Sequence, residues 1–257
     1  MHGAPVMAVV GALLGFLSGM FGVGGSSIAT PLLRLLGVPQ LVALATPLPM
    51  TVPAAVMGGW YYWRRGQVDL RAAAWTALGG VPCVALGALA SAEVPGRLLM
   101  LLAGALVTGA GLRILRSPAP SLEADAPKAG WGGLVLLGAG VGLLSGLLAN
   151  GGGFLLLPAY LLLFHMEPQA AAATSLVAVA LMALPGIWVH ARLGHIDPGM
   201  AAALCIGVVP FTYLGARVGS RLHGDTARRL FGWTLLAFGL LFLIRTLFRA
   251  WEFGWTG

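Results

Sequence analysis

Two stretches of this chain carry the same glycine-rich pattern inside otherwise apolar sequence. Residues 15–33 read GFLSGMFGVGGSSIATPLL, and residues 142–160 read GLLSGLLANGGGFLLLPAY. The serine of LSG, the double glycine and the proline recur 127 positions further on in the second copy. Glycines let the backbone leave a helix and approach another group closely, so each copy predicts a break in an apolar helix.

The sequence around these breaks is too apolar for a water-soluble domain. Of the 257 residues, 58% are hydrophobic and only 9% are charged, which leaves too little charge to cover a soluble surface. The basic residues fall in short connections between apolar segments, where they suit anchoring at a membrane surface rather than binding of nucleic acid. We therefore predict an all-α, polytopic membrane protein in a lipid bilayer, with no nucleic-acid partner.

Apolar segments divide the chain into two similar halves. The first half, residues 1–115, has segments at 5–21, 26–36, 41–63, 72–90 and 98–115; the second, 131–250, has them at 131–149, 154–164, 170–189, 200–219 and 229–248. The second segment of each half, at roughly 16 Å of helix, is too short to cross a bilayer. With the first segment it predicts a broken or re-entrant pair of half-helices beside three longer spans. Residues 116–130 predict a linker, and residues 251–257 a tail.

Further landmarks recur at a nearly constant spacing. The tetrapeptide GQVD at 66–69 corresponds to GHID at 194–197, and a proline and a glycine in the next segment recur at the same offset of 128. This regularity indicates an internal duplication. The third segment carries Pro47, Pro49 and Pro53, so we expect it to be kinked or partly unwound in its first half.

The charges favour inverted halves, although parallel halves stay open. If the first two segments form a hairpin or broken helix, the second half is inverted; if only the short segment dips in and returns, the halves are parallel. Inversion places ten of the 15 Lys and Arg residues on one face, and the parallel arrangement nine. The positive-inside rule then leaves both termini outside the cytoplasm. The ten are Arg64, Arg65, Arg71, Arg113, Arg116, Lys128, Arg217, Arg221, Arg228 and Arg229.

The polar groups available within the membrane suit an anion. All eight Asp and Glu residues lie in connections, linker or tail, so we expect neither a carboxylate proton relay nor a cation site at depth. The helices that start after the glycine pairs project unpaired N–H groups and a partial positive charge. Two such helix ends converging near the midplane are the geometry expected of an anion carrier with inverted repeats.

The candidate residues lie at the two breaks and in the third segments. Arg34 and His165 are candidates for an electrostatic or coupling role, although Arg34 also suits snorkelling, and His165, like His190, suits an interface. Ser18 and Ser145 of the LSG motifs are expected to serve packing. The sequence predicts no cofactor, metal or catalytic site. The substrate-binding candidates are Gly24, Gly25, Ser26, Ser27, Thr46, Asn150, Gly151, Gly152, Gly153, Thr174 and Ser175.

The duplicated G-x-L-S-G-x-x-x-x-G-G-x-x-x-x-x-P, the Thr46 and Ser175 positions and the G-x-V/I-D motif resemble the TauE/SafE sulfite exporter family, from about Val9 to Arg245. The resemblance implies a secondary transporter of small sulfur-containing anions in the bacterial cytoplasmic (inner) membrane. It places the binding candidates at residues 24–27 and 150–153. The first copy departs from a triple glycine, because Ser26 stands where the second copy has Gly153.

The sequence thus predicts a carrier that exports sulfite, a sulfonate such as sulfoacetate, or thiosulfate by alternating access. Protons are a candidate coupling ion, and the sequence does not decide whether they are used. One alternative is an importer or channel of the same architecture for another small anion. A less favoured alternative is an intramembrane serine hydrolase, with Ser18 or Ser145 as nucleophile and His165 or His190 as base. The last alternative is a purely structural membrane subunit, against which the twinned helix breaks argue.

Overall fold

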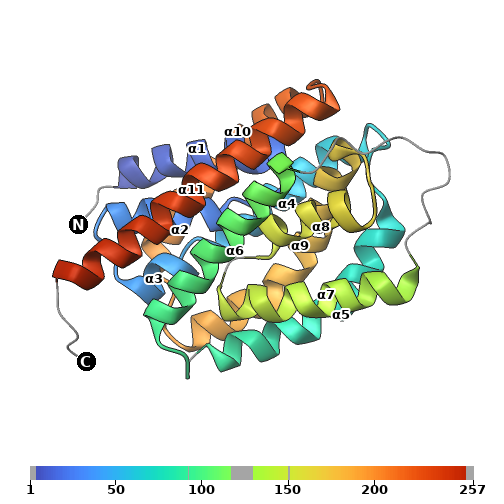
Figure 1. Cartoon of the computed structure of the whole chain (residues 1–257). Helices are drawn as coiled ribbons and strands as arrows, with labels where there is room; N and C mark the ends of the chain where they lie inside the picture. Colours follow the sequence, from blue (N-terminus) through green and yellow to red (C-terminus); the bar gives the residue numbers. More distant parts are fainter. Residues whose placement is uncertain (1–3, 92, 117–129, 150, 253–257) are drawn as a thin grey trace.

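The computed structural model describes residues 4–91, 93–116, 130–149 and 151–252, and these residues form α-helices without a strand (Figure 1). The all-α prediction is confirmed. The predicted linker, apart from its first and last residues, lies outside the described residues, as do Asn150 and most of the predicted tail. The helices are α1 (Ala4–Phe21), α2 (Ser26–Leu35), α3 (Gln40–Ala45), α4 (Leu48–Trp63), α5 (Leu70–Ala90), α6 (Gly96–Arg116), α7 (Trp131–Leu147), α8 (Gly153–Leu163), α9 (Pro168–Arg192), α10 (Pro198–Gly219) and α11 (Gly224–Glu252).

Several of these helices are long and apolar enough to cross a membrane. The candidate spans are Leu41–Trp63, Leu70–Ala90, Arg97–Arg116, Pro168–Arg192 and Pro198–Gly219, and α2 and α8 are the short half-helices that the sequence predicts. The first of these spans is interrupted between α3 and α4, at Thr46 and Pro47, where the prolines predict a kink. The protein is therefore a multi-pass membrane protein.

The two halves exchange their first helices. α1 packs along α10 of the second half, and α7 of the second half packs along α5 of the first. Both seams are built on glycine: a Cβ on Gly15 would lie 2.8 Å from Val208 Cα, and a Cβ on Gly142 2.8 Å from Gly80 Cα. Such distances leave no room for a side chain, so small residues set the helix separation.

Equivalent helices of the two halves run antiparallel. The N–H of Asp69, just after α4, donates to Thr174 Oγ1 near the start of α9 at 3.0 Å. The N–H of Asp197, after α9, donates to Thr46 Oγ1 just before α4, also at 3.0 Å. α6 and α11 likewise pair in opposite directions, since Gly111 packs near Leu236 while Gly239 packs near Thr108. The arrangement is compatible with inverted repeats.

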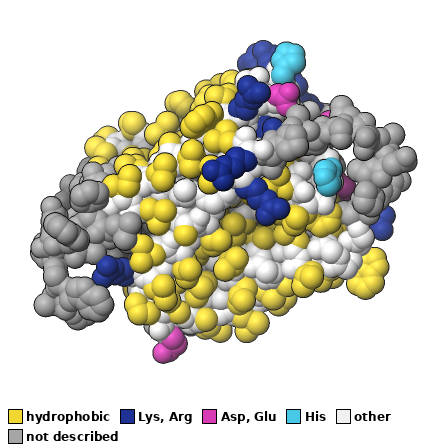
Figure 2. Space-filling view, in the orientation of Figure 1, with side chains coloured by type: hydrophobic (Ala, Val, Ile, Leu, Met, Phe, Trp, Pro, Cys, Tyr) yellow, Lys and Arg dark blue, Asp and Glu magenta, His cyan; other side chains and the backbone are white. Residues whose placement is uncertain are grey.

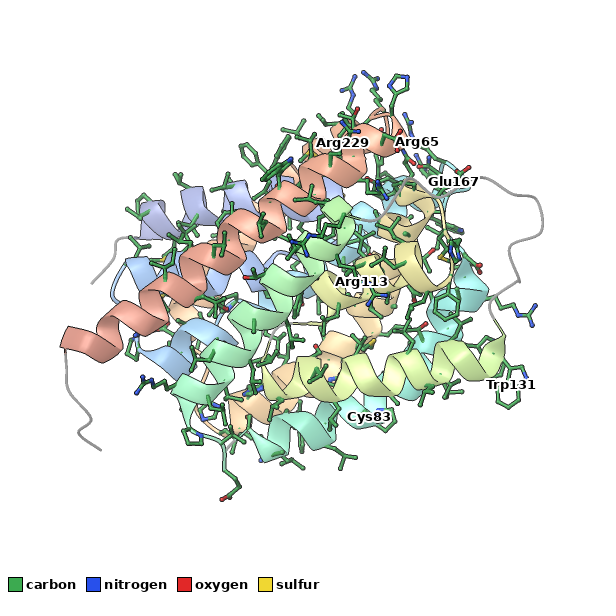
Figure 3. All side chains as sticks on the ribbon, viewed as in Figure 1. Arg65, Cys83, Arg113, Trp131, Glu167 and Arg229 are labelled. Atoms are coloured by element: carbon green, nitrogen blue, oxygen red, sulfur yellow. The ribbon has the colours of Figure 1, made fainter. Side chains whose placement is uncertain are left out.

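Basic side chains gather at one end of the molecule, which we call the basic end. There α4 and α10 terminate side by side, with Tyr61 Oη 3.4 Å from Ser220 Oγ. Arg65 and Arg229 point outward at this end (Figure 3), and most Lys and Arg side chains visible in Figure 2 lie towards it, beyond a largely hydrophobic face. α1 begins and α11 ends at the opposite end (Figure 1).

Candidate functional site

The first break is the turn between α1 and α2, which we call the first tip (residues 22–25). Gly22, Gly24 and Gly25 have φ angles of 73°, 75° and 78°, in the left-handed region that favours glycine. α2 begins at Ser26 directly after this turn, and its N-cap residue, Gly25, has no side chain with which to cap the helix. The first-turn N–H groups and the partial positive charge of α2 therefore point into the tip.

The second break, between α7 and α8, repeats this geometry and is called the second tip (residues 148–152). Gly151 and Gly152 have φ angles of 68° and 82°, and Ala149, at the position equivalent to Gly22, has a φ of 50°. α8 begins at Gly153, and its N-cap residue, Gly152, likewise has no side chain with which to cap the helix. The predicted site residue Asn150 lies outside the described residues.

The two tips are in direct contact. A Cβ on Gly153 would collide with the carbonyl oxygen of Val23 and lie 2.6 Å from its carbonyl carbon. A Cβ on Gly151 would lie 3.6 Å from Ser26 Oγ and 3.6 Å from Thr51 Oγ1. The residues at this contact are buried. The N-termini of two half-helices from opposite halves of the chain thus meet within the protein.

Two buried hydroxyl groups lie directly against the tips. Ser18 is 0% exposed and Ser145 is 2% exposed, and neither Oγ has a hydrogen-bond partner in the described part of the structure. A Cβ on Gly25 would lie 3.5 Å from Ser18 Cβ, and a Cβ on Gly152 3.2 Å from Ser145 Oγ. These serines pack as expected, but each also holds an unused hydrogen-bond donor beside the tip of its own half.

Sequence reasoning missed Thr51, which lies at the contact between the tips. It is fully buried, and its hydroxyl donates to the Leu48 carbonyl at 2.7 Å. A Cβ on Gly24 would lie 3.6 Å from Thr51 Cβ and 3.1 Å from Cγ1 of Val179, the residue 128 positions later. The internal duplication is the one sequence signal that could have drawn attention to Thr51, because it pairs Thr51 with Val179. It does not indicate that either residue lies close to a tip.

The predicted candidates Thr46 and Thr174 have their hydroxyls engaged elsewhere. Each accepts the backbone N–H of the aspartate in the other half's G-x-V/I-D motif, Asp197 for Thr46 and Asp69 for Thr174. The same aspartates cap the next helices, because their carboxylates accept the N–H three residues on at 2.9 Å. The motif is therefore a helix cap that also fastens one half of the chain to the other.

Ser175 supports the first tip from α9. Its hydroxyl lies 2.7 Å from the Gly22 carbonyl and 2.9 Å from the Ala172 carbonyl, so it is a shared donor to both. Because Ser175 is fully buried, this bond fixes where the backbone leaves α1. The side chain of Ser27, another predicted candidate, is outside the described part of the structure.

Arg34 and His165 do not join the tips. Arg34 lies in the last turn of α2, away from its N-terminus, and its Nη1 donates to the Val38 carbonyl at 2.6 Å. His165 is exposed in the turn after α8, where it has a φ of 50°. The geometry therefore places Arg34 at the end of a half-helix and His165 at a connection.

The tips offer neutral hydrogen-bond donors. The described residues include no group of His, Cys, Asp or Glu that could hold a metal ion. Helix N-termini attract a small anion and disfavour a cation, and a hydroxyl can donate a hydrogen bond to that anion. Because neither Ser18 nor Ser145 has a hydrogen-bond partner in the described structure, none of the histidines that it describes lies within hydrogen-bond reach as a base. The hydrolase alternative thus gains no geometric support.

Crossing helices, a duplicated chain and two buried half-helix ends that meet define a class of protein: a multi-pass membrane transporter. The chain belongs to the family described as sulfite exporter TauE/SafE, whose model matches residues 7–242. It is a multi-pass protein of the bacterial inner membrane.

Relatives with curated descriptions are similar over almost their whole lengths. The "Probable membrane transporter protein" of Xylella fastidiosa (strain Temecula1) is 30% identical over 249 residues, covering 92% of this chain and 93% of the relative. The "Probable membrane transporter protein YjnA" of Bacillus subtilis is 25% identical over 245 residues, covering 90% of this chain and 96% of the relative. No solved structure matches this chain.

Proposed function

We propose that this protein is a secondary transporter of small sulfur-containing anions of the sulfite, sulfonate and thiosulfate class. The anion binds where the two tips meet, and export proceeds by alternating rocking of the two halves. The backbone of both tips and the adjoining hydroxyls form the site; its proposed members are Ser18, Gly24, Gly25, Ser26, Ser27, Thr51, Ser145, Asn150, Gly151, Gly152 and Gly153.

One observation carries the proposal: two half-helix N-termini meet beside two buried hydroxyls that have no hydrogen-bond partner among the described residues. An anion leaving water needs donors to replace its hydration shell. Here it would receive backbone N–H groups from both helices and one hydroxyl from each LSG motif. The family description adds sulfite as the first anion to test.

Thr46, Thr174 and Ser175 enter the proposal as supports rather than direct ligands. Their hydroxyls hold the caps of α5 and α10 and the first tip. Because Thr46 and Thr174 connect the two halves, their bonds are suited to guide a rocking motion between them. Arg34 would act on the anion only through its long-range field.

Transport is tested with the purified protein in proteoliposomes. Vesicles loaded with unlabelled sulfite, thiosulfate or a small sulfonate should take up the labelled anion by saturable exchange, and chloride and phosphate should compete weakly. Exchange of a different anion alone would reject the substrate class. Absence of exchange for every anion would reject the transporter proposal itself.

A matched pair of glycine variants tests the site. In Gly153→Ala the new Cβ meets the Val23 carbonyl carbon at 2.6 Å, so the tips must separate by about 0.8 Å to reach an ordinary contact near 3.4 Å. A hydrogen bond of about 2.9 Å stretched by this amount is lost, which should weaken anion affinity roughly tenfold or more. Gly140→Ala is the control, because a Cβ there meets nothing within 4 Å. Equal affinities in both variants would remove the tips from the mechanism.

An importer or a channel of the same architecture is the second candidate. The same tips would bind the anion in either case, so the distinction is kinetic. A carrier shows faster exchange when substrate is present on both sides, whereas a channel conducts down the gradient without such acceleration. Measuring uptake with and without internal anion therefore distinguishes a carrier from a channel.

A further inference from the structure

A pair of histidines lies next to the second tip. His190, in the last turn of α9, is 2% exposed, and its Nε2 lies 3.2 Å from the carbonyl oxygen of Gly146. Its Nδ1 lies 3.2 Å from Nδ1 of His195, which is only partly buried. Gly146 follows Ser145 in the LSG motif, so the pair is one residue away from the proposed anion site.

The first half makes the same contact with a different residue. Tyr62, 128 positions before His190, donates its hydroxyl to the carbonyl of Gly19, the LSG glycine of the first half, at 3.1 Å. His195 corresponds to Gln67. A phenol and an amide do not change charge near neutral pH, whereas imidazoles do. The hydrogen bond to the LSG glycine is thus common to both halves, but a titratable pair makes it in only one.

The hydrogen bonds determine how many protons the pair holds. A carbonyl oxygen only accepts, so Nε2 of His190 carries a hydrogen, and Nδ1 of the neutral ring accepts. Nδ1 of His195 then donates to it, which leaves Nε2 of His195 available for a proton. One added proton makes His195 an imidazolium whose bond to His190 persists. A second would place hydrogens on both Nδ1 atoms and break the contact.

Few other charged groups face the pair. α7 has no titratable residue, and the carboxylate of Asp197 is engaged as the cap of Met200. The guanidinium of Arg192 lies 5.2 Å from the Trp188 ring centre. Cys83 of α5 is partly buried, and Glu93, after α5, is exposed. Burial lowers the pKa of His195, so its second ring nitrogen takes up a proton at a lower pH than a solvent-exposed histidine does.

We propose that His190 and His195 form a one-proton binding site that couples proton uptake to movement of the second tip. The route is short, because the bond from His190 holds the carbonyl of Gly146 in the last turn of α7. The pair lies at the C-terminal end of α9, opposite the basic end, and the positive-inside rule places that end outside the cytoplasm. The proposal rests on the anion transport proposed above.

The test replaces the pair by the residues of the first half. His190→Tyr/His195→Gln should keep the hydrogen bond to Gly146 and the anion site. Wild-type protein should take up labelled thiosulfate, whose charge stays constant over this range, at least about threefold faster when the pH on the histidine side falls from 8 to 5; the range extends below the usual one for histidine because burial lowers the pKa of His195. The double variant should lose this response and retain anion exchange at equal pH. His165→Gln, which removes an exposed histidine, is the matched control and should respond as the wild type does.

The outcomes separate the two proposals. Anion exchange with an unchanged pH response in the double variant would overturn the proton site and leave the transporter intact. Absence of exchange in the wild-type protein would overturn the transporter and the coupling with it. If the double variant does not fold, His195→Gln alone decides the matter, because it removes the proton acceptor and leaves the bond between His190 and Gly146.

Discussion

Removing the two LSG hydroxyls should make the protein more stable and less able to transport. Ser18 and Ser145 are buried without hydrogen-bond partners in the described structure, and a buried unsatisfied hydroxyl costs about 1–3 kcal/mol. Ser18→Ala/Ser145→Ala removes both costs, so the unfolding free energy should rise by about 1–2 kcal/mol after allowing for relaxation of the site. Most substitutions of buried residues act in the opposite direction.

The same double variant should bind the anion more weakly. A hydrogen bond to a charged group contributes about 1.5–3 kcal/mol, so losing one hydroxyl should raise the Kd for sulfite or thiosulfate about 10- to 150-fold. Loss of the second should add to this. Transport at substrate concentrations well below Kd should fall by the same factor, whereas saturating substrate should recover part of the rate.

The assay combines thermal unfolding in detergent with exchange in proteoliposomes. Ser91→Ala is the matched control: Ser91 is equally buried, but its hydroxyl donates to the Ala88 carbonyl at 2.7 Å on its own helix. It should lose a little stability and leave anion affinity unchanged. A double variant that is less stable than wild type, or that binds the anion with wild-type affinity, would refute the assignment of these hydroxyls to the site.

Three further predictions concern packing, the cross-half caps and orientation. Gly207→Ala places a Cβ 2.7 Å from the backbone nitrogen of Ala12 and should lower stability by about 1–3 kcal/mol in a thermal melt, whereas Gly140→Ala should not. Thr46→Val removes the acceptor for the Asp197 N–H and should cost about 1–3 kcal/mol, measured in the same melt; an unchanged melting temperature would mean that water replaces the threonine. In a variant without native cysteines, an impermeant maleimide added to intact cells should label a cysteine at position 97 and not one at position 65; the reverse would overturn the orientation.

The helices could be predicted from the sequence because lipid leaves little choice. Long apolar segments in a membrane must be helical to satisfy their backbone groups, and glycine and proline mark where they end. The predicted half-helix at 26–36 corresponds to α2, and the proline-rich segment at 41–63 is broken where Pro47 follows Thr46. The differences lie at helix ends, where fraying makes boundaries least definite; the largest is at α11 (Gly224–Glu252), which extends beyond the predicted segment 229–248 at both ends.

The positions of the hydroxyls could not be predicted, because periodicity does not say which face of a helix meets a tip. Thr46 and Thr174 are candidates for anion binding on the sequence alone, because they are polar residues beside a helix break. In the structure their hydroxyls instead accept the backbone N–H groups of Asp197 and Asp69, which are distant in sequence. The sequence indicates that Ser18 and Ser145 are small packing residues. It does not distinguish packing from ligand binding, because both roles require a buried small residue. Only the lack of a hydrogen-bond partner distinguishes them, and that requires the full set of neighbours.

The two halves share their geometry and differ in chemistry at a few buried positions near the tips. Gly15 and Gly142 make equivalent seams, and Gly19 and Gly146 accept equivalent hydrogen bonds. A shared geometry lets the site open to either side with the same contacts. A bound proton or anion, however, shifts the balance between the two open states only if it interacts differently with each of them, and identical halves would offer it the same contacts in both. Tyr62 opposite His190, and Thr51 opposite Val179, are therefore the positions where we expect substitutions to change coupling and anion preference while leaving the fold intact.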